Sequence, residues 1–250
     1  MPRIQFMNIE IDNLTMDGAL EEINRLIEEN KQAYVVTPNV DHIVQLESGG
    51  SLCEVYKHAN LILTDGKPLL WIAKWYGTPI KEKISGSDLF PQLCKMAAEK
   101  GYKMFFLGAA EGVAAKAAKR LEKRYPGLQI AGTYSPPYGF EKDSSEIEKI
   151  QQMIIEKSPQ ILIVSLGCPK QELFIYHNRK ILNVPISLGL GASLDFEAGN
   201  IKRAPKWMSD YGLEWFYRIT QDPKRLIKRY LVDDIKIFRL AWRYKNKKIL

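Results

Sequence analysis

The stretch AYVVTPNVDHIVQ, residues 33–45, indicates the fold, because an apolar run stops abruptly in it and a helical pattern begins. The run before Thr37 has the composition of a strand buried on both faces, and Pro38 ends it since proline has no N–H for a sheet ladder. Ligands of open α/β sheets bind at the carboxyl ends of the strands, so Thr37, Asn39 and Asp41 are candidate site residues. Capping of the following helix is an equally good role for Asn39.

A second stretch, LILTDG at residues 61–66, repeats the pattern of an apolar strand, polar residues and a break into a helix. This pattern predicts that Asp65 lies beside Thr37. A carboxylate at a strand end among apolar neighbours can have its pKa adjusted and act as a general base. A helix cap is again the alternative role.

Further strand-like runs alternate with helical patterns along the chain, at residues 103–107, 128–134, 161–166 and 184–188. Strands that alternate with helices of about ten to fifteen residues predict parallel βαβ units. We therefore expect an α/β fold with a Rossmann-like, mostly parallel, doubly wound sheet and helices on both faces. Residues 1–202 are expected to form it as one catalytic core.

Several weaker candidates follow other predicted strands or precede helices. Gly108 opens a glycine turn that can present backbone N–H groups to a diphosphate, although GAAEG lacks the full dinucleotide fingerprint. Tyr138 could stack on a base or sugar, or it could pack under its own loop. Gln171 comes after the most apolar strand, and Lys83 could either meet a phosphate or be solvated.

The net charge of +7 is concentrated at the C-terminus. Residues 202–250 hold 14 Lys or Arg and five Asp or Glu, and residues 203–250 hold nine of the 26 aromatic side chains, at helical spacing. Such a basic, amphipathic helical appendage can lie in a membrane interface against anionic head groups, or it can dock on the core. We expect residues 203–250 to dock on a membrane. An apolar face exposed in solution could also lead to a homo-oligomer.

The cysteines and the apolar runs indicate the cellular compartment in which the protein is expected. Cys53, Cys94 and Cys168 form no CxxC pair, which argues against a disulfide framework or a zinc site and favours a reducing compartment. No run has the pattern of a signal peptide or membrane span, so we expect a cytoplasmic protein. Trp71 and Trp75, one helical turn apart, are expected in the core.

Five segments in order resemble the WecG/TagA/CpsF family of bacterial glycosyltransferases: TPNVDHIV, LTDGKPLLW, SGSDLF, LGCPKQE and GASLDFEAGNIKRAPKWMSDYGLEWFYRITQDPKRLIKRYL. The resemblance covers nearly the whole chain, and five motifs in order are far more specific than any one. Members of this family transfer N-acetylmannosamine or a related sugar from a UDP-sugar to undecaprenyl-diphosphate-linked N-acetylglucosamine at the cytoplasmic membrane face. The TagA branch does so for the wall teichoic acid linkage unit.

The resemblance implies an inverting transferase that is peripherally associated with the inner face of the plasma membrane. Its expected partners are a UDP-sugar donor, an undecaprenyl-diphosphate-linked acceptor and an anionic membrane surface. The resemblance also implies that Thr37, Asn39, Asp65 and Gln171 are active-site residues, with Asp65 as the base. The basic position before SGSD is often arginine in the family and is Lys83 here, which loses the bidentate geometry for phosphate.

The leaving diphosphate needs positive charge. The sequence has no Asp-x-Asp motif, and the nearest substitute, Asp195-Phe-Glu197, is a type of pair that is more often structural. Clustered cations offer a route without metal, so we expect no metal and no other cofactor. The candidate substrate-binding residues are Lys83, Gly108, Tyr138, Asp195, Arg203, Arg218, Arg225 and Arg229.

Two other classes compete with a transferase. A nucleotide-dependent oxidoreductase on a Rossmann-like sheet would need a better fingerprint than GAAEG. A basic nucleic-acid-binding module would need aromatic side chains spaced for a stacking groove, whereas those of residues 203–250 are spaced for an apolar helix face. We therefore expect no nucleic-acid partner.

Overall fold

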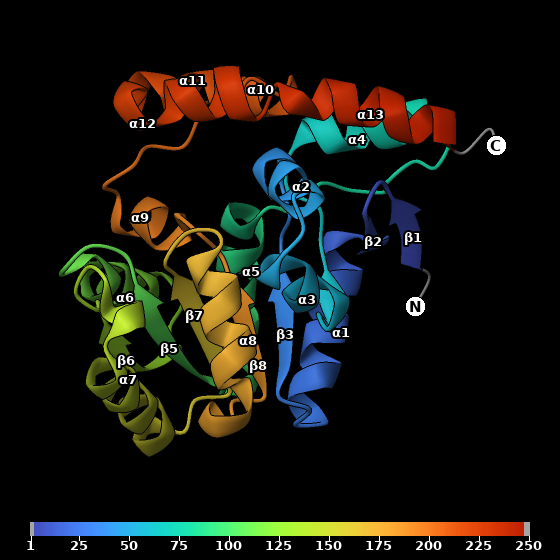
Figure 1. Cartoon of the computed structure of the whole chain (residues 1–250). Helices are drawn as coiled ribbons and strands as arrows, with labels where there is room; N and C mark the ends of the chain where they lie inside the picture. Colours follow the sequence, from blue (N-terminus) through green and yellow to red (C-terminus); the bar gives the residue numbers. More distant parts are fainter. Residues whose placement is uncertain (1–2, 248–250) are drawn as a thin grey trace.

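Six parallel strands form the central sheet in the computed structural model of the chain, and helices cover both of its faces (Figure 1). The strands, in chain order, are β3 (Ala33–Val36), β4 (Leu61–Ile62), β5 (Lys103–Gly108), β6 (Gln129–Tyr134), β7 (Ile161–Ser165) and β8 (Ile186–Gly189). Their order across the sheet is β4-β3-β8-β7-β5-β6, and every neighbouring pair is parallel. The expected α/β class with a Rossmann-like, doubly wound sheet is confirmed.

The structure describes residues 3–247, apart from the side chains of Lys206, Asp210, Arg225 and Lys247. A hairpin of β1 (Arg3–Phe6) and β2 (Ile9–Asp12) precedes the sheet. The helices between the strands and after β8 are α1 (Met16–Glu28), α2 (Val40–Glu47), α3 (Ser51–Lys57), α4 (Lys67–Trp75), α5 (Gly86–Lys100), α6 (Val113–Arg124), α7 (Ser144–Lys157), α8 (Lys170–Leu182) and α9 (Ser193–Ala198).

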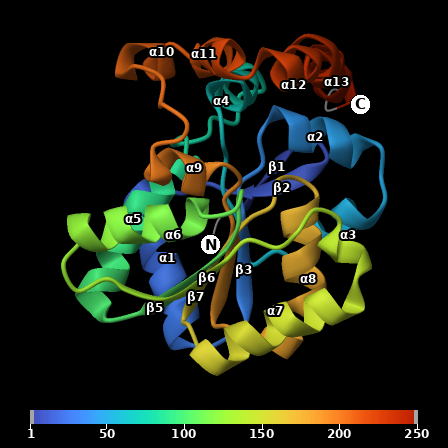
Figure 2. The same cartoon turned by 90° about the vertical axis from the view of Figure 1, so that its left-hand side faces the viewer.

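Alternate side chains of the central strands enter two separate cores, one on each face of the sheet. Val35 and Leu188 pack with α1, α5 and α6, whereas Tyr34 and Val36 pack with α3, α7 and α8. Figure 2 shows these two helical layers on opposite sides of the strands. All four residues of β3 are buried, as the apolar run predicts. Because both faces are covered, polar side chains that need solvent or a ligand are left mainly to the strand ends.

The C-terminal segment forms a layer of helices across the carboxyl ends of the strands, next to α4 (Figure 1). It consists of α10 (Lys206–Asp210), α11 (Glu214–Gln221), α12 (Pro223–Lys228), a π-helical turn (Arg229–Asp233) and α13 (Lys236–Lys247). Helix α13 is docked on the core, since Ile237 and Ala241 are buried and the Tyr76 hydroxyl donates to the Ala241 carbonyl oxygen at 2.7 Å. No helix among the described residues is long and apolar enough to cross a membrane.

The expectation that Trp71 and Trp75 belong to the core is wrong. Their side chains are 54% and 48% exposed, and α4 instead buries Leu69, Ile72 and Ala73. The spacing of four correctly places both tryptophans on one side of the helix. It does not say which side of an apolar helix packs inward, and here the smaller side chains do.

Candidate active site

A cleft of about 1200 Å³ lies between the carboxyl ends of the strands and the C-terminal helices. It is larger than most small-molecule pockets, which occupy about 300–1,000 Å³, so two substrates can occupy it together. Nine of the residues selected from the sequence line it. They are Thr37, Asn39, Asp41, Asp65, Lys83, Gln171, Asp195, Arg218 and Arg229.

The other selected residues lie elsewhere. Tyr138 is fully exposed outside the cleft lining, with the Lys170 ammonium 4.9 Å from its ring centroid. Gly108 has φ +107°, and a Cβ there would lie 2.4 Å from the Ser165 carbonyl oxygen, so close packing of β5 on β7 requires glycine. Arg203 lines an adjoining hollow. The side chain of Arg225 lies outside the described part of the structure.

Asp65 stands at the end of β4, against the loop that follows β3. Its backbone N–H donates to the Pro38 carbonyl oxygen at 2.9 Å, which fixes the two strand ends side by side. Burial raises the pKa of Asp65 to about 6, Glu214 of the C-terminal layer adds to this rise, and Lys83 and Arg218 oppose it. A carboxylate with a pKa near neutrality is suited to general-base catalysis.

Lys83 is part of a charge cluster below Asp65 and is not a solvated surface lysine. Its ammonium lies 2.6 Å from one carboxylate oxygen of Asp88, and the Arg203 guanidinium bonds the other. Burial opposes ionisation of Asp88, but Lys83, Ser85 and Arg203 together lower its pKa to about 2. Two of the expected phosphate-binding cations therefore already share a carboxylate.

Asn39 caps α2 and also lines the cleft, so its capping role does not remove it from the candidate site. Its Oδ1 accepts from the backbone N–H of His42 at the start of α2. The same oxygen accepts from the Arg229 guanidinium at 3.3 Å. Arg229 also lies 3.3 Å from a carboxylate oxygen of Asp41. The C-terminal layer is thus bonded to the loop after β3.

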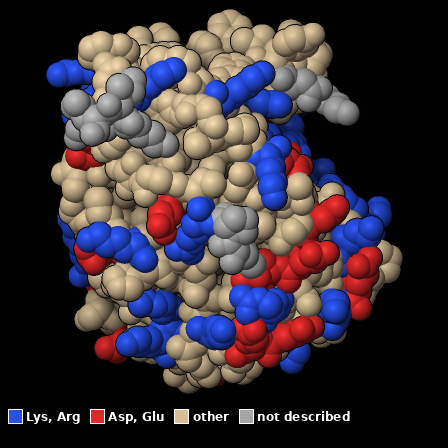
Figure 3. Space-filling view, turned by 90° about the vertical axis from the view of Figure 1, so that its right-hand side faces the viewer, with Lys and Arg blue, Asp and Glu red and all other residues tan. Residues whose placement is uncertain are grey.

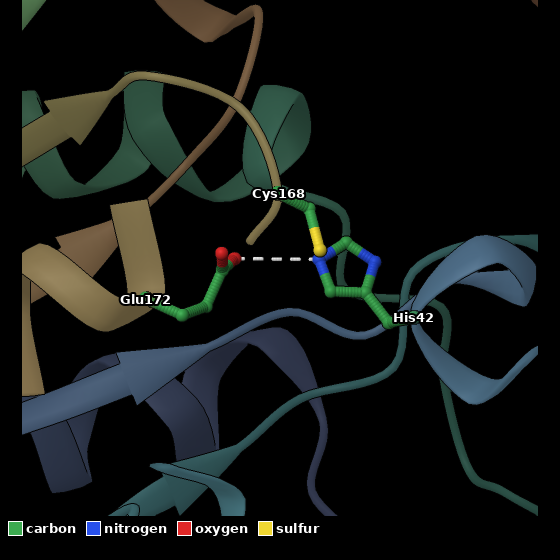
Figure 4. Close-up of side chains that lie close together, drawn as sticks. All are labelled: His42, Cys168 and Glu172. Carbon is green, nitrogen blue, oxygen red and sulfur yellow. Dashed lines mark hydrogen bonds and ion pairs between the residues drawn. The ribbon is translucent and has the colours of Figure 1, made fainter. Parts of the chain in front are cut away.

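Gln171 belongs to a buried network that the sequence patterns did not reveal. Its Nε2 donates to the Glu172 carboxylate at 2.7 Å, and its Oε1 accepts from the Gly191 N–H at 3.0 Å. The same Glu172 oxygen lies 3.3 Å from Nε2 of His42 (Figure 4). Burial disfavours the charged imidazole, but Cys168 and Glu172 raise the pKa of His42 to about 10. The one feature of the sequence that could have pointed to this network is His42, three residues after the capping Asn39.

The carboxylates considered as a metal site do not converge. Asp195 lines the cleft, whereas Glu197 bonds Arg124 at 2.7 Å where α9 packs on α6. Among the described residues, one group of His, Cys, Asp or Glu side chains has its ligand atoms within 4.8 Å of one another: His42, Cys168 and Glu172. In this group, Nε2 of His42 and one carboxylate oxygen of Glu172 are already hydrogen-bonded to each other.

Comparison with known proteins agrees with the motifs. The family described as "Glycosyl transferase WecG/TagA/CpsF family" matches residues 4–249. The chain belongs to this family. It is therefore a glycosyltransferase, as the resemblance implied. The family match favours this class over an oxidoreductase or a nucleic-acid-binding module.

Three members of the WecG/TagA/CpsF family illustrate the similarity, and each is named an N-acetylglucosaminyldiphosphoundecaprenol N-acetyl-beta-D-mannosaminyltransferase. The protein of Bacillus spizizenii is 36% identical over 80% of this chain and 75% of its own length. That of Bacillus subtilis is 34% identical over 78% and 73%. That of Staphylococcus aureus is 26% identical over 90% and 87%.

Replacing Asp65 by Asn is expected to stabilise the fold while removing the candidate base. The pKa of about 6 lies above the ordinary 3.8, so between these pH values the folded chain holds a proton that the unfolded chain has released. Stability therefore falls as pH rises through this window. Asn carries no charge, so Asp65→Asn should raise Tm at pH 8, with a smaller difference at pH 4, and lower turnover by about 10²–10⁴-fold.

Asp88→Asn is the matched control. The pKa of Asp88 is lowered to about 2, so its ionised form stabilises the fold above the ordinary pKa, and this variant should lower Tm at pH 8. Thermal unfolding followed by circular dichroism measures both variants. If Asp65→Asn lowered Tm at pH 8 as Asp88→Asn does, Asp65 would not be a desolvated base.

Proposed function

We propose that the enzyme transfers N-acetylmannosamine, or a closely related sugar, from a UDP-sugar to undecaprenyl-diphosphate-linked N-acetylglucosamine, with inversion. The reaction would take place at the cytoplasmic face of the plasma membrane, in the synthesis of wall teichoic acid or a related surface polysaccharide. The observation that carries this proposal is a carboxylate with raised pKa, Asp65, between a strand edge and a layer of basic helices. The names of the relatives support the choice of sugar and acceptor.

Asp65 is the base in this reaction. It takes the proton of the acceptor hydroxyl while that oxygen bonds to the anomeric carbon of the donor from the face opposite UDP. The bond from the anomeric carbon to the diphosphate breaks, and UDP leaves with the electron pair. Thr37, Asn39 and Gln171 line the same cleft and hold the two substrates in line, a role in positioning and not in proton transfer.

Arg218 is the arginine of the cleft best placed to stabilise the leaving diphosphate. Lys83 and Arg203 are both paired with Asp88, and Arg229 is paired with Asp41. The guanidinium of Arg218 lies 5.8 Å from the Phe196 ring centroid, and among the described residues it has no carboxylate within ion-pair distance. Its charge is therefore free for a phosphate, which Arg can bind in bidentate fashion.

The C-terminal layer and α4 together present an apolar face for the membrane. Of the sixteen exposed large hydrophobic side chains in the described part of the chain, eleven come from this layer and two from α4. In Figure 3 the upper end of the molecule shows tan and blue atoms without red, unlike the mixed charges below. Helices of this kind insert apolar side chains between lipids while Lys and Arg meet anionic head groups.

The cleft connects this face with the base. Its lining changes from polar groups around Asp65 to Trp75, Phe238 and Trp242 between α4 and α13. A lipid-linked acceptor could therefore reach Asp65 while its chain stays near the bilayer. On this account residues 203–250 form a membrane-docking appendage that also completes the site of the core, residues 1–202.

The function is tested with a panel of UDP-sugars and a short-chain lipid-diphosphate N-acetylglucosamine acceptor. UDP-N-acetylmannosamine should be the preferred donor, and turnover should persist in EDTA because cations of the protein stabilise the diphosphate. Arg218→Ala should lower turnover by about 10²-fold, as loss of one electrostatic stabiliser does. Arg203→Ala, which removes a cation outside the cleft, is the matched control and should cost far less.

Three results would contradict this account. The proposed reaction fails if no UDP-N-acetylhexosamine serves as donor. The route without metal fails if chelation abolishes turnover and only added magnesium restores it. The assignment of Arg218 fails if its substitution costs no more than that of Arg203.

Membrane docking is tested by sedimentation with phosphatidylglycerol vesicles. The double variant Phe238→Ser and Trp242→Ser removes two side chains that are 70% and 64% exposed, and it should reduce sedimentation strongly. Ile155→Ser and Ile181→Ser, two exposed positions on other helices, form the matched control. Equal sedimentation of both double variants would place the membrane contact elsewhere.

A further inference from the structure

The side-chain oxygen of Asn39 faces three N–H donors. The closest is Nδ1 of His42 at 2.8 Å, followed by the Arg229 guanidinium at 3.3 Å and the His42 backbone N–H at 3.4 Å. An amide NH₂ in this position would face two of these donors without an acceptor, so the oxygen must point this way. The Asn39 NH₂ group is thereby left for the cleft.

The imidazole of His42 lies between two oxygen acceptors. Its Nδ1 faces the Asn39 oxygen at 2.8 Å and its Nε2 faces the Glu172 carboxylate at 3.3 Å. The Asn39 backbone N–H also approaches Nδ1, but at the longer distance of 3.4 Å. In the capping box of α2 this N–H donates to Nδ1 of the neutral ring, whereas the closer Asn39 oxygen calls for a proton on Nδ1. We assign the proton from the shorter contact, so that both ring nitrogens carry protons and the ring is an imidazolium. The raised pKa of His42 agrees with this state.

The surroundings of this ring hold it in place. His42 is 6% and Glu172 1% exposed, so the pair is shielded from solvent. Breaking a buried ion pair by removing one partner is costly, because the other charge stays buried without compensation. The charged and titratable groups near the imidazole are Asp41, Tyr56, Cys168, Glu172, Arg229 and Asp234.

A single oxygen of Glu172 joins two walls of the cleft. It accepts from His42, which fixes Asn39 after β3, and it accepts from Gln171 of α8 at 2.7 Å. The other end of the Gln171 amide is fixed by the Gly191 N–H at 3.0 Å. Both amides thus take their orientation from a carboxylate that lies behind them.

We propose that Glu172 is a positioning residue of the transferase site: through the His42 imidazolium and directly, it holds the Asn39 and Gln171 amides with their remaining N–H groups toward the bound sugar nucleotide. Donors that are already oriented need no rearrangement when negative charge develops on the leaving diphosphate. The inference rests on the proposed function for what the amides contact. The arrangement of the amides itself rests on the hydrogen bonds alone.

The kinetic test is Glu172→Gln, which keeps the size of the side chain and removes its charge. It should lower kcat by about 10–100-fold with a small change in KM, the scale of a slight misplacement of contacting groups. In an Asn39→Ala background the same substitution should cost much less, because part of its effect passes through Asn39. Glu22→Gln is the matched control, since Glu22 is also a buried carboxylate paired with an arginine, Arg25, but on α1.

The direct test uses unaltered protein, so it stands even if a variant fails to fold. Nitrogen-15 NMR of the imidazole rings should show protons on both nitrogens of His42 at pH 7. The exposed His58 and His177 provide the only other histidine signals. A neutral ring, or a ring nitrogen bound to added Zn²⁺ or Co²⁺ in place of its proton, would overturn the proposal.

The outcomes separate this inference from the proposed function. If wild-type protein transfers sugar and Glu172→Gln matches it within about twofold, well below the usual effect of misplacement, the positioning role is wrong and the function stands. If wild-type protein transfers no sugar but NMR shows the imidazolium, the function is wrong and the arrangement of the amides stands.

Discussion

Burial of Asp65 at the strand ends, beneath the C-terminal helices, is the condition on which the proposed site depends. The core supplies the carboxylate at the end of β4, and the parallel register of β3 and β4 brings it beside Thr37 and Asn39. An aspartate at an open sheet edge would be solvated and ionised far below neutral pH. Burial raises the pKa of Asp65 to about 6, and Glu214 of the covering layer adds to this rise. On the proposed function, residues 1–202 and the C-terminal helices together form the site.

The covering layer is basic, and three of its arginines, Arg203, Arg229 and Arg243, are paired with carboxylates of the core. Arg229 is bonded to Asp41 and Asn39, and Arg203 to Asp88. These pairs hold the layer on the strand ends and leave Arg218 for an anionic ligand. The division explains how a site could handle a diphosphate without an Asp-x-Asp motif. The buried pair of Glu172 and His42 lies behind the Asn39 and Gln171 amides, which on our proposal face the same ligand.

The fold was predictable because parallel strands covered on both faces must be apolar runs, and their ends must hold the polar residues. The same reasoning selects Thr37, Asn39, Asp65 and Gln171 from the amino-acid sequence alone, and all four line one cleft. It could not say that Trp71 lines the cleft and is not part of the core, because a periodic pattern does not state which side of a helix packs inward. The exposure of Tyr138, in a loop, is also not fixed by its sequence neighbours.

Long-range pairing was equally beyond the sequence. His42 and Glu172 are 130 positions apart and meet because α2 follows β3 and α8 follows β7, the two strands that flank β8 in the sheet. The same holds for Arg203 and Asp88, which form an ion pair across 115 positions. The charge state of each side chain in such a pair depends on its distance from the partner and on its burial. The periodic pattern of apolar residues in the sequence contains neither.

The most direct measurement of the central claim is the titration of the Asp65 carboxyl carbon by NMR in the full chain, compared with the pH profile of kcat/KM. The account predicts a midpoint near pH 6 in the titration and an inflection of kcat/KM at the same pH, with activity on the basic side. A midpoint near the ordinary value of 3.8 would contradict it, because Asp65 would then be open to solvent beneath the C-terminal helices.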